Sequence, residues 1–298
     1  MVLFKSVFEQ TLFEDWLKTK KNMTESSVYV YRTAIDHFLS YNPDIENIDD
    51  YNKFIIAHCI KKRSIHYYSI LKCYIKYVIK DANTRNQMLE QLIKPDTPST
   101  IKRERKYLDE KMLISIVNNF KKTKHKIMAL IQDLTGVRAG DILRLKKKDI
   151  IPEIYEDKNV IKLVITGKGN KRNIVYIHEE MVQTLLIDYL INHINELPYA
   201  FIEDHTIRDK SEHNRKMYHA NYKAYYRDLK MSLDMSGISH QDFATHDYRR
   251  CFARRVWTRY KDIQVLQNLL NHKNPSTTMR YLSQSGLKNI DYLKQMQA

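Results

Sequence analysis

Three short stretches of this chain of 298 residues carry cationic side chains in positions from which they could bind an anion. "LTGVRAGDILRL" places Arg138 after a glycine turn, at the expected start of a helix. "ITGKGNKRNIVYI" has the pattern of a β-hairpin and places Lys168 at its tip. "THDYRRCFARR" spaces His246 and Arg249 by three residues, so the two lie on one face of a helix.

A fourth stretch, "LLNHKNPSTTMRYL", singles out one of the 21 tyrosines. His272 follows an expected helix, Asn274 can cap the next one, and Pro275 suits its first position. Tyr281, nine residues after His272, then lies two turns into that helix. Each stretch alone also has an ordinary explanation, such as a surface arginine, a solubilising turn lysine, a polar helix face or an amphipathic tyrosine.

Together the four stretches supply the groups that a phosphodiester would need in order to react. The guanidinium group of an arginine can donate two hydrogen bonds to its non-bridging oxygens and neutralise their charge. A tyrosine hydroxyl, with a pKa of about 10, can attack only with a base or strong charge stabilisation beside it. Lysine or histidine can protonate the leaving 5′-oxygen. The sequence shows no cluster of carboxylates that would suggest a divalent metal, so we expect neither a metal nor another cofactor.

The charge of the chain is consistent with a polyanionic partner. Its net charge is +15, and 29% of its residues are charged. The excess is local, with 14 Lys and Arg against 6 Asp and Glu in residues 101–150, and 8 against 2 in residues 251–298. We expect a surface that faces phosphates, although a charge that only aids solubility is the simpler alternative.

The remaining composition favours a globular protein of a reducing compartment. The three cysteines, Cys59, Cys73 and Cys251, form no CxxC pair, which fits buried thiols and argues against a zinc site. No apolar run is long enough to cross a membrane, and the first residues have the pattern of a folded domain rather than a signal peptide. We therefore expect a cytoplasmic protein without a membrane partner.

The periodicity of the sequence divides the chain into two domains and a linker. Residues 1–93 have helical spacing and are expected to form a helical domain. Residues 94–106 contain two prolines and a basic run and are expected to form a linker. Four cations of this linker would suit a strap across a nucleic-acid backbone, or an ordinary solvated connection: Lys102, Arg103, Arg105 and Lys106.

Residues 107–298 are expected to form a second domain that is mainly α with one small antiparallel sheet. "NVIKLVI" and "NIVYI" are β-branched runs joined by a hairpin turn. "KIMALIQDLTG" predicts a helix that Gly136 ends, and "AGDILRLKKKDI" predicts an amphipathic helix with Ile142, Leu143 and Leu145 inward. Thr245 is the expected cap of the helix that carries His246.

The four stretches, in this order, resemble the boxes of the tyrosine recombinases, the family of phage integrases and Xer-type recombinases. "TGVRAGDILRL" matches the first-arginine box, "TGKGNKR" the hairpin lysine segment, "HDYRR" the His-x-x-Arg box and "LLNHKNPSTTMRY" the His-to-Tyr box. The joint match is specific, although each piece is not. Asn271, where the family often has glycine, and Cys251, where a small or polar residue is more usual, depart from the pattern.

The resemblance implies a role for each of these residues. Arg138 and Arg249 would bind the scissile phosphate, and Tyr281 would be the nucleophile that forms a 3′-phosphotyrosyl bond. Lys168, with Lys171 as the alternative, would protonate the leaving oxygen. The remaining roles are proton transfer and phosphate contact for two histidines, site orientation for one aspartate, and DNA binding for two arginines: His246, His272, Asp141, Arg172 and Arg250.

The resemblance also implies an architecture and an assembly. The two domains would close as a C-shaped clamp on double-stranded DNA, and four protomers would exchange strands on two sites through a Holliday junction. Without DNA the protein would be a monomer or weak dimer, and accessory recombination proteins could assist. A tail helix at residues 286–296 would dock on a neighbouring protomer or on its own domain. The host would be prokaryotic or virus-infected, with the protein at the nucleoid.

Two other functions fit parts of the same pattern. A type IB topoisomerase resembles the same catalytic domain and would relax supercoils as a monomer. A non-catalytic DNA-binding relative would bind DNA with steep salt dependence but would not cleave it. The presence of all six expected catalytic residues argues against a non-catalytic relative.

Overall fold

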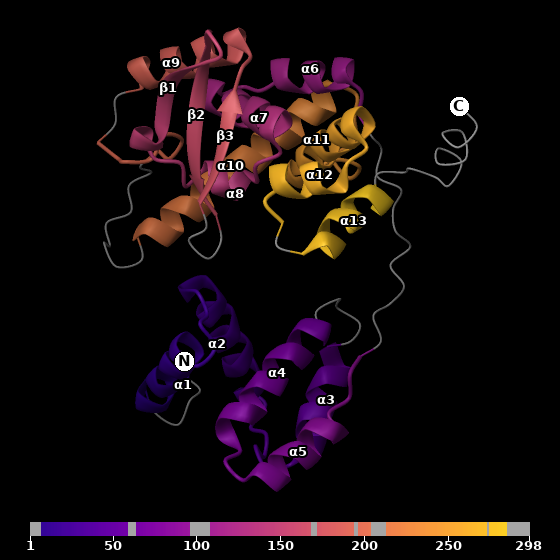
Figure 1. Cartoon of the computed structure of the whole chain (residues 1–298). Helices are drawn as coiled ribbons and strands as arrows, with labels where there is room; N and C mark the ends of the chain where they lie inside the picture. Colours follow the sequence, from indigo (N-terminus) through magenta and orange to yellow (C-terminus); the bar gives the residue numbers. More distant parts are fainter. Residues whose placement is uncertain are drawn as a thin grey trace, which may run out of the picture. The chain divides into compact units, whose positions relative to one another are not determined.

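The computed structural model describes residues 7–58, 64–95, 108–167, 172–193, 196–203, 213–272 and 274–284, and it divides the chain into two compact units, 1–102 and 103–298 (Figure 1). No helix in these described ranges is long and apolar enough to cross a membrane. The described part of the first unit consists of five helices: α1 Val7–Thr19, α2 Glu25–Leu39, α3 Ile48–His58, α4 Ser64–Val78 and α5 Ala82–Gln91.

The first unit has a hydrophobic core of its own. Large aromatic residues fill it, and Phe13, Phe38 and Tyr51 are fully buried. Helix α2 packs on α1 and α4, and α3 packs on α4. Amphipathic helices of this length are marginal alone, so burial of their apolar faces against one another is what holds them.

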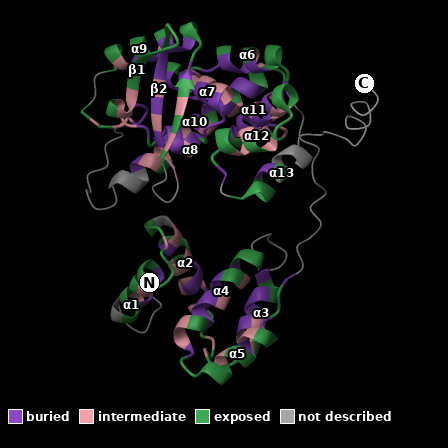
Figure 2. Cartoon of the chain, in the orientation of Figure 1, coloured by how far each residue is buried: buried purple, intermediate pink, exposed green. Residues whose placement is uncertain are grey.

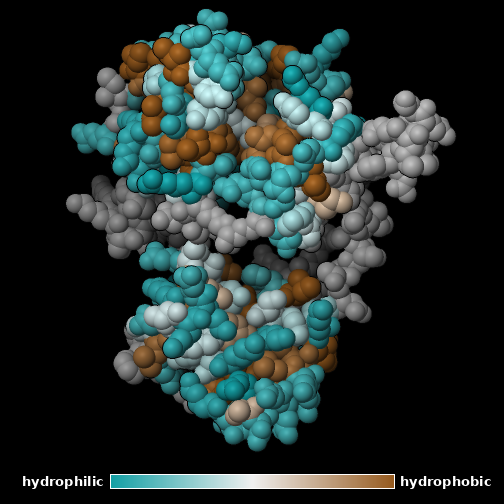
Figure 3. Space-filling model, viewed as in Figure 1, coloured by the Kyte–Doolittle hydropathy of each residue, from teal (hydrophilic) through white to brown (hydrophobic). Residues whose placement is uncertain are grey.

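The second unit combines helices with one sheet, which confirms the fold class expected from the sequence. Its described elements follow in chain order: α6 Glu110–Asn118, α7 Thr123–Thr135, α8 Ala139–Ile142, the 3-10 helix η2 Lys147–Asp149, β1 Ile150–Tyr155, β2 Lys158–Thr166, β3 Arg172–Ile177, α9 Glu180–Asn192, α10 His213–Met235, α11 Thr245–Tyr260, α12 Ile263–Leu269 and α13 Pro275–Gln284. Buried residues gather on α7 and β2 inside this unit (Figure 2). Hydrophilic side chains, in teal, cover most of its visible surface (Figure 3).

The sheet is antiparallel with the order β1-β2-β3. The expected hairpin of β2 and β3 is confirmed, with Ile161 opposite Ile177 and Thr166 opposite Arg172. Strand β1 was not expected, because Pro152 interrupts its apolar run and a proline cannot donate to a sheet ladder. At the edge of the sheet a proline is tolerated, and β1 pairs with β2 alone.

The helix expected over "AGDILRLKKKDI" is wrong in length, because α8 ends at Ile142. The three apolar residues that define its inward face, Ile142, Leu143 and Leu145, are buried as expected. After α8 the chain turns away to pair with a distant segment, since the Leu145 carbonyl accepts a hydrogen bond from the Ala200 amide at 2.9 Å. A long-range pairing of this kind leaves no trace in local periodicity.

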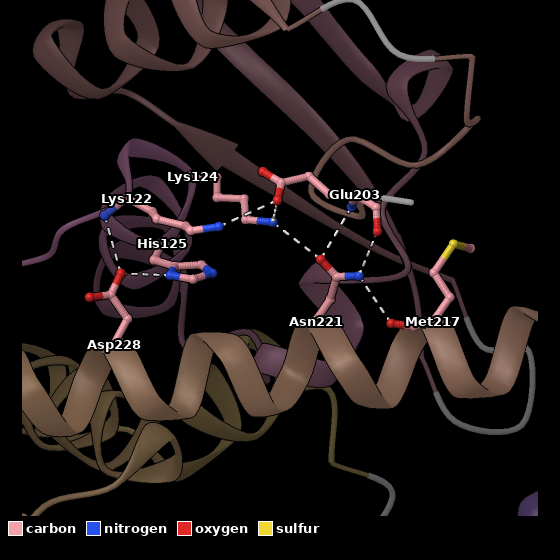
Figure 4. A network of polar contacts seen from close by, with 7 residues as sticks. All are labelled: Lys122, Lys124, His125, Glu203, Met217, Asn221 and Asp228. Carbon is pink, nitrogen blue, oxygen red and sulfur yellow. Dashed lines mark hydrogen bonds and ion pairs between the residues drawn. The ribbon is translucent and has the colours of Figure 1, made fainter. Parts of the chain in front are cut away.

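Helix α7 is anchored at its start by a buried polar network (Figure 4). The Asp228 carboxylate, on α10, accepts hydrogen bonds from the Lys122 amide at 3.2 Å and from His125 Nδ1 at 2.7 Å. Lys124, only 2% exposed, donates to Asn221 Oδ1 at 3.2 Å and pairs with Glu203 at 2.9 Å. A carboxylate at a helix N-terminus satisfies its open amides and stabilises its dipole. The network therefore fixes the helix whose other end leads to Arg138.

Candidate active site

The end of α7 approaches α11 closely at one glycine. Gly136 ends α7 in the left-handed conformation at φ 67°, and its amide donates to the Gln132 carbonyl at 2.9 Å. A Cβ atom at this position would stand 2.5 Å from a ring carbon of Phe252. Glycine alone satisfies both the backbone angle and the close approach. Its carbonyl oxygen is thereby presented to the neighbouring helix.

Arg249 on α11 connects three of the four sequence stretches. It is 4% exposed, and its Nη1 donates to the Gly136 carbonyl at 2.6 Å. Its Nη2 donates to the Leu270 carbonyl and lies 3.0 Å from His272 Nε2. A buried guanidinium needs acceptors on several sides, and these are supplied by residues from far along the chain.

His272 occupies the turn between α12 and α13 and is 8% exposed. Its amide donates to the Gln267 carbonyl at 3.1 Å, and its Nδ1 lies 2.9 Å from Thr278 Oγ1. Asn271 before it has φ 48°, a left-handed angle that asparagine adopts more readily than most residues. Asn271 can therefore form the turn that places the histidine.

Arg138 precedes α8 and is held from one side by Asp141. Arg138 Nη1 lies 3.7 Å from Asp141 Oδ2, and Arg144 Nη2 donates to Asp141 Oδ1 at 2.6 Å. Asp141 is buried, whereas the Arg138 side chain is 47% exposed. Arg144 in turn lies over the ring of Tyr218, with its Cζ 5.3 Å from the ring centroid. The carboxylate can thus orient an arginine that faces solvent.

The positive charges of these residues act on both histidines. Burial first, and then the cations of Arg249 and Arg138, together lower the pKa of His272 to about 4. The pKa of His246 is also lowered to about 4, chiefly by partial burial of its ring although the residue as a whole is exposed, and then by Arg249 and Arg138. Both shifts favour the neutral ring at pH 7, and the neighbouring arginine cations suit an anion.

Folding stability should depend on these two histidines below neutral pH. The unfolded chain binds their protons near pH 6.5, whereas the folded chain binds them only near pH 4. Because the unfolded state binds more protons in this window, the free energy of unfolding should fall as the pH is lowered from 6.5 towards 4. Urea unfolding between these limits measures the slope. In His272→Gln the slope should be smaller, and an unchanged slope would contradict the assignment.

The cap of α11 differs from the one expected. Ala244 is the N-cap residue, and the Asp247 carboxylate accepts its amide at 2.8 Å, so the prediction of Thr245 as the cap is wrong. Thr245 is the first helical residue, and its carbonyl accepts from Gln132 Nε2 at 3.0 Å. Asp247 also accepts from Arg250 Nη1 at 2.7 Å, so this expected DNA-binding arginine has an intramolecular partner.

Several expected site residues lie outside the described part of the chain. The Tyr281 side chain is among them, although its backbone belongs to α13. Arg172 is described and is exposed at the first residue of β3, opposite Thr166. The others outside the described ranges are the two hairpin lysines, the linker cations and the tail: Lys168, Lys171, Lys102, Arg103, Arg105, Lys106 and residues 286–296.

Three residues around the site were not identified from the sequence: Arg144, Thr278 and Tyr218. Arg144 is three residues after Asp141, so helical spacing could have suggested the pair. Thr278 and Tyr218 contact the site only through the packing of α13 and α10. Within the ranges that the structure describes, no group of three or more His, Cys, Asp or Glu residues could hold a metal ion.

Comparisons with known proteins identify relatives of this chain. Residues 106–286 match the model of the phage integrase family. The tyrosine recombinase XerA of Saccharolobus solfataricus is 28% identical over 280 residues, covering 91% of this chain and 87% of that relative. The tyrosine recombinase XerD of Rickettsia bellii is 23% identical over 290 residues, covering 90% of this chain and 92% of that relative.

Solved structures of similar proteins share the fold. The XerH site-specific recombinase bound to a palindromic difH substrate, in a post-cleavage complex, has a TM-score of 0.63 at 17% identity, covering 97% of this chain and 85% of that chain. A lambda integrase dimer bound to a COC′ core site has a TM-score of 0.65 at 15% identity, covering 95% of this chain and 97% of that chain.

Proposed function

The chain belongs to the phage integrase family of tyrosine recombinases, and from this premise we propose that it cuts and rejoins duplex DNA at specific sites through a covalent 3′-phosphotyrosyl intermediate. The observation that carries the proposal is the contact of Arg249 with His272 and the Gly136 carbonyl, beside the Asp141–Arg138 pair. This arrangement gathers cations around one point, which is what a scissile phosphate requires.

In this mechanism Arg138 and Arg249 neutralise the non-bridging oxygens of the scissile phosphate. The Tyr281 oxygen attacks phosphorus, and the bond from phosphorus to the 5′-oxygen breaks. Lys168 or Lys171 gives a proton to that leaving oxygen, and His246 and His272 assist in proton transfer. The phosphotyrosine keeps the energy of the broken bond, so a second 5′-hydroxyl can reverse the reaction without ATP or metal.

We extend the proposal to the partner and the assembly. The first unit and the second unit together would clamp duplex DNA, with the linker cations on its backbone. Four protomers on two sites would exchange strands through a Holliday junction, and protein without DNA would be a monomer or weak dimer. The XerH structure is a complex with a difH substrate and the lambda integrase structure a complex with a COC′ core site, which supports duplex DNA as the partner. We place this activity at the nucleoid of a prokaryotic or virus-infected host.

A nicked suicide substrate tests the reaction directly. Cleavage near a nick releases a short strand, so the covalent adduct accumulates and migrates as a shifted band on a denaturing gel. The adduct should form in the presence of EDTA and without ATP. Its absence with the correct site would refute the proposal, and fast relaxation of supercoils by monomers without site preference would favour the topoisomerase alternative.

Asp141→Asn is expected to slow adduct formation by about 10-fold while leaving DNA affinity nearly unchanged. The amide keeps the shape of the side chain but removes the negative charge between Arg138 and Arg144. Arg138 would then sample orientations that do not face the phosphate. Single-turnover cleavage of the suicide substrate gives the rate, and fluorescence anisotropy gives the affinity.

Asp149→Asn provides the control for Asp141→Asn. Asp149 lies in η2, a few residues further along the chain from Asp141. Neutralising it should leave the cleavage rate close to that of the wild type. Equal rates for Asp141→Asn and the wild type would show that the carboxylate does not position Arg138.

A further inference from the structure

The two ring nitrogens of His272 have different partners, and these partners determine where its proton lies. Nε2 is 3.0 Å from Arg249 Nη2. A guanidinium has only N–H donors, so Nε2 must accept and carries no proton. The neutral ring then has its proton on Nδ1, which lies 2.9 Å from Thr278 Oγ1. The threonine hydroxyl is therefore the acceptor of the Nδ1–H.

Thr278 is well placed to hold the ring in this orientation. It is fully buried, at 0% exposed, so bulk water does not compete for the histidine proton. It lies in the first part of α13, three residues before Tyr281 on the same helix. One hydrogen bond thus joins the helix of the expected nucleophile to the residue that contacts Arg249.

We propose that Thr278 is a positioning residue: by accepting the Nδ1–H it holds the His272 ring with Nε2 towards Arg249, and so keeps the Arg249 guanidinium in place for the phosphate. The inference rests on the proposed function for its catalytic consequence. As the Tyr281 oxygen bonds to phosphorus, its proton passes to the neutral His246 ring, while His272 Nε2 keeps accepting the Arg249 Nη2–H and its Nδ1–H stays bonded to Thr278. The leaving 5′-oxygen receives its proton from the general acid, so the protons balance.

Two substitutions separate this role from simple packing. Thr278→Val keeps the branched shape and loses the hydroxyl, whereas Thr278→Ser keeps the hydroxyl and loses a methyl group. If Thr278 only fills space, Val should be tolerated and Ser should be the more harmful change. If it positions His272, the order is reversed.

The cleavage experiment uses the full chain and the suicide substrate in single turnover. Thr278→Val should slow adduct formation by about 10- to 100-fold, because a small displacement of a group that holds the reacting phosphate can cost up to about 100-fold in rate. Thr278→Ser should cleave at close to the wild-type rate, and both variants should bind DNA as the wild type does. A Val variant as fast as the wild type would overturn the proposal.

A second measurement does not depend on activity. Nitrogen-15 spectra of histidine-labelled protein without DNA distinguish a protonated from an unprotonated ring nitrogen, and His272→Asn identifies the resonance. Wild type and Thr278→Ser should show Nδ1 protonated and Nε2 unprotonated at neutral pH, and in Thr278→Val the Nδ1 resonance should shift because its N–H has lost the hydroxyl acceptor. A wild-type ring protonated on Nε2 would refute the role of Thr278, whereas a wild type that forms no adduct would refute only the proposed function.

Discussion

Tyr281→Phe is expected to abolish the covalent adduct, with a loss of at least about 10,000-fold. Phenylalanine keeps the ring but has no oxygen to bond to phosphorus, and none of the neighbouring groups can replace a missing nucleophile. The measurement is the yield of shifted band on a denaturing gel after prolonged incubation with the suicide substrate. DNA affinity should remain close to that of the wild type, because the change removes a reacting atom and leaves every cation in place.

Tyr260→Phe is the matched control for this prediction. Tyr260 is the last residue of α11, is 55% exposed and has Arg259 over its ring. Removing its hydroxyl should leave adduct formation unchanged. If Tyr281→Phe still forms an adduct, another residue is the nucleophile, and the assignment of Tyr281 is lost together with the role of α13.

Arg249→Lys should have the second largest effect, because the residue serves both the chemistry and the fold. A lysine ammonium cannot reproduce the planar fork that contacts Gly136, Leu270 and His272. We expect cleavage to fall by at least about 1,000-fold, in the range seen when a preorganised donor to a reacting oxygen is removed. Lysine can keep one or two of these three contacts, and each lost hydrogen bond to a charged group costs about 1.5–3 kcal/mol, so the free energy of unfolding should fall by about 1.5–6 kcal/mol.

The two effects of Arg249→Lys can be measured separately. Urea unfolding gives the stability, and single-turnover cleavage well below the unfolding transition gives the rate of the folded protein. Arg259→Lys, at an exposed position of the same helix, is the control and should change neither quantity measurably. A folded Arg249→Lys protein that cleaves at the wild-type rate would show that Arg249 is structural only.

The expectations that the structure confirms rest on local signals. Gly136 was expected to end a helix, and it caps α7 in the conformation for which glycine is suited. The hairpin of β2 and β3 follows from two β-branched runs around a glycine-rich turn. Family membership follows from four stretches whose order and spacing are properties of the sequence itself.

The expectations that failed involve partners far away in the chain. Strand β1 was missed, because Pro152 weakens its pattern and only its place at the sheet edge makes it a strand. The helix at Arg138 is shorter than expected, since Leu145 pairs with Ala200. Thr245 is a residue type that favours the N-cap position, yet Ala244 is the N-cap residue of α11 and its amide donates to the Asp247 carboxylate. In each case a tertiary or neighbouring contact outweighed the local preference.

The sequence by itself determined the family, the division into helical and mixed parts, and the residue types available for phosphate chemistry. Only the tertiary structure decided which of them touch. Arg249 and Gly136 are 113 residues apart in the chain, yet Arg249 Nη1 lies 2.6 Å from the Gly136 carbonyl oxygen. The position of the proton on His272 follows from the contacts of its two ring nitrogens with Arg249 and Thr278. Periodicity reports which face of a helix is apolar, whereas hydrogen-bond partners depend on how helices pack, and packing is a property of the whole core.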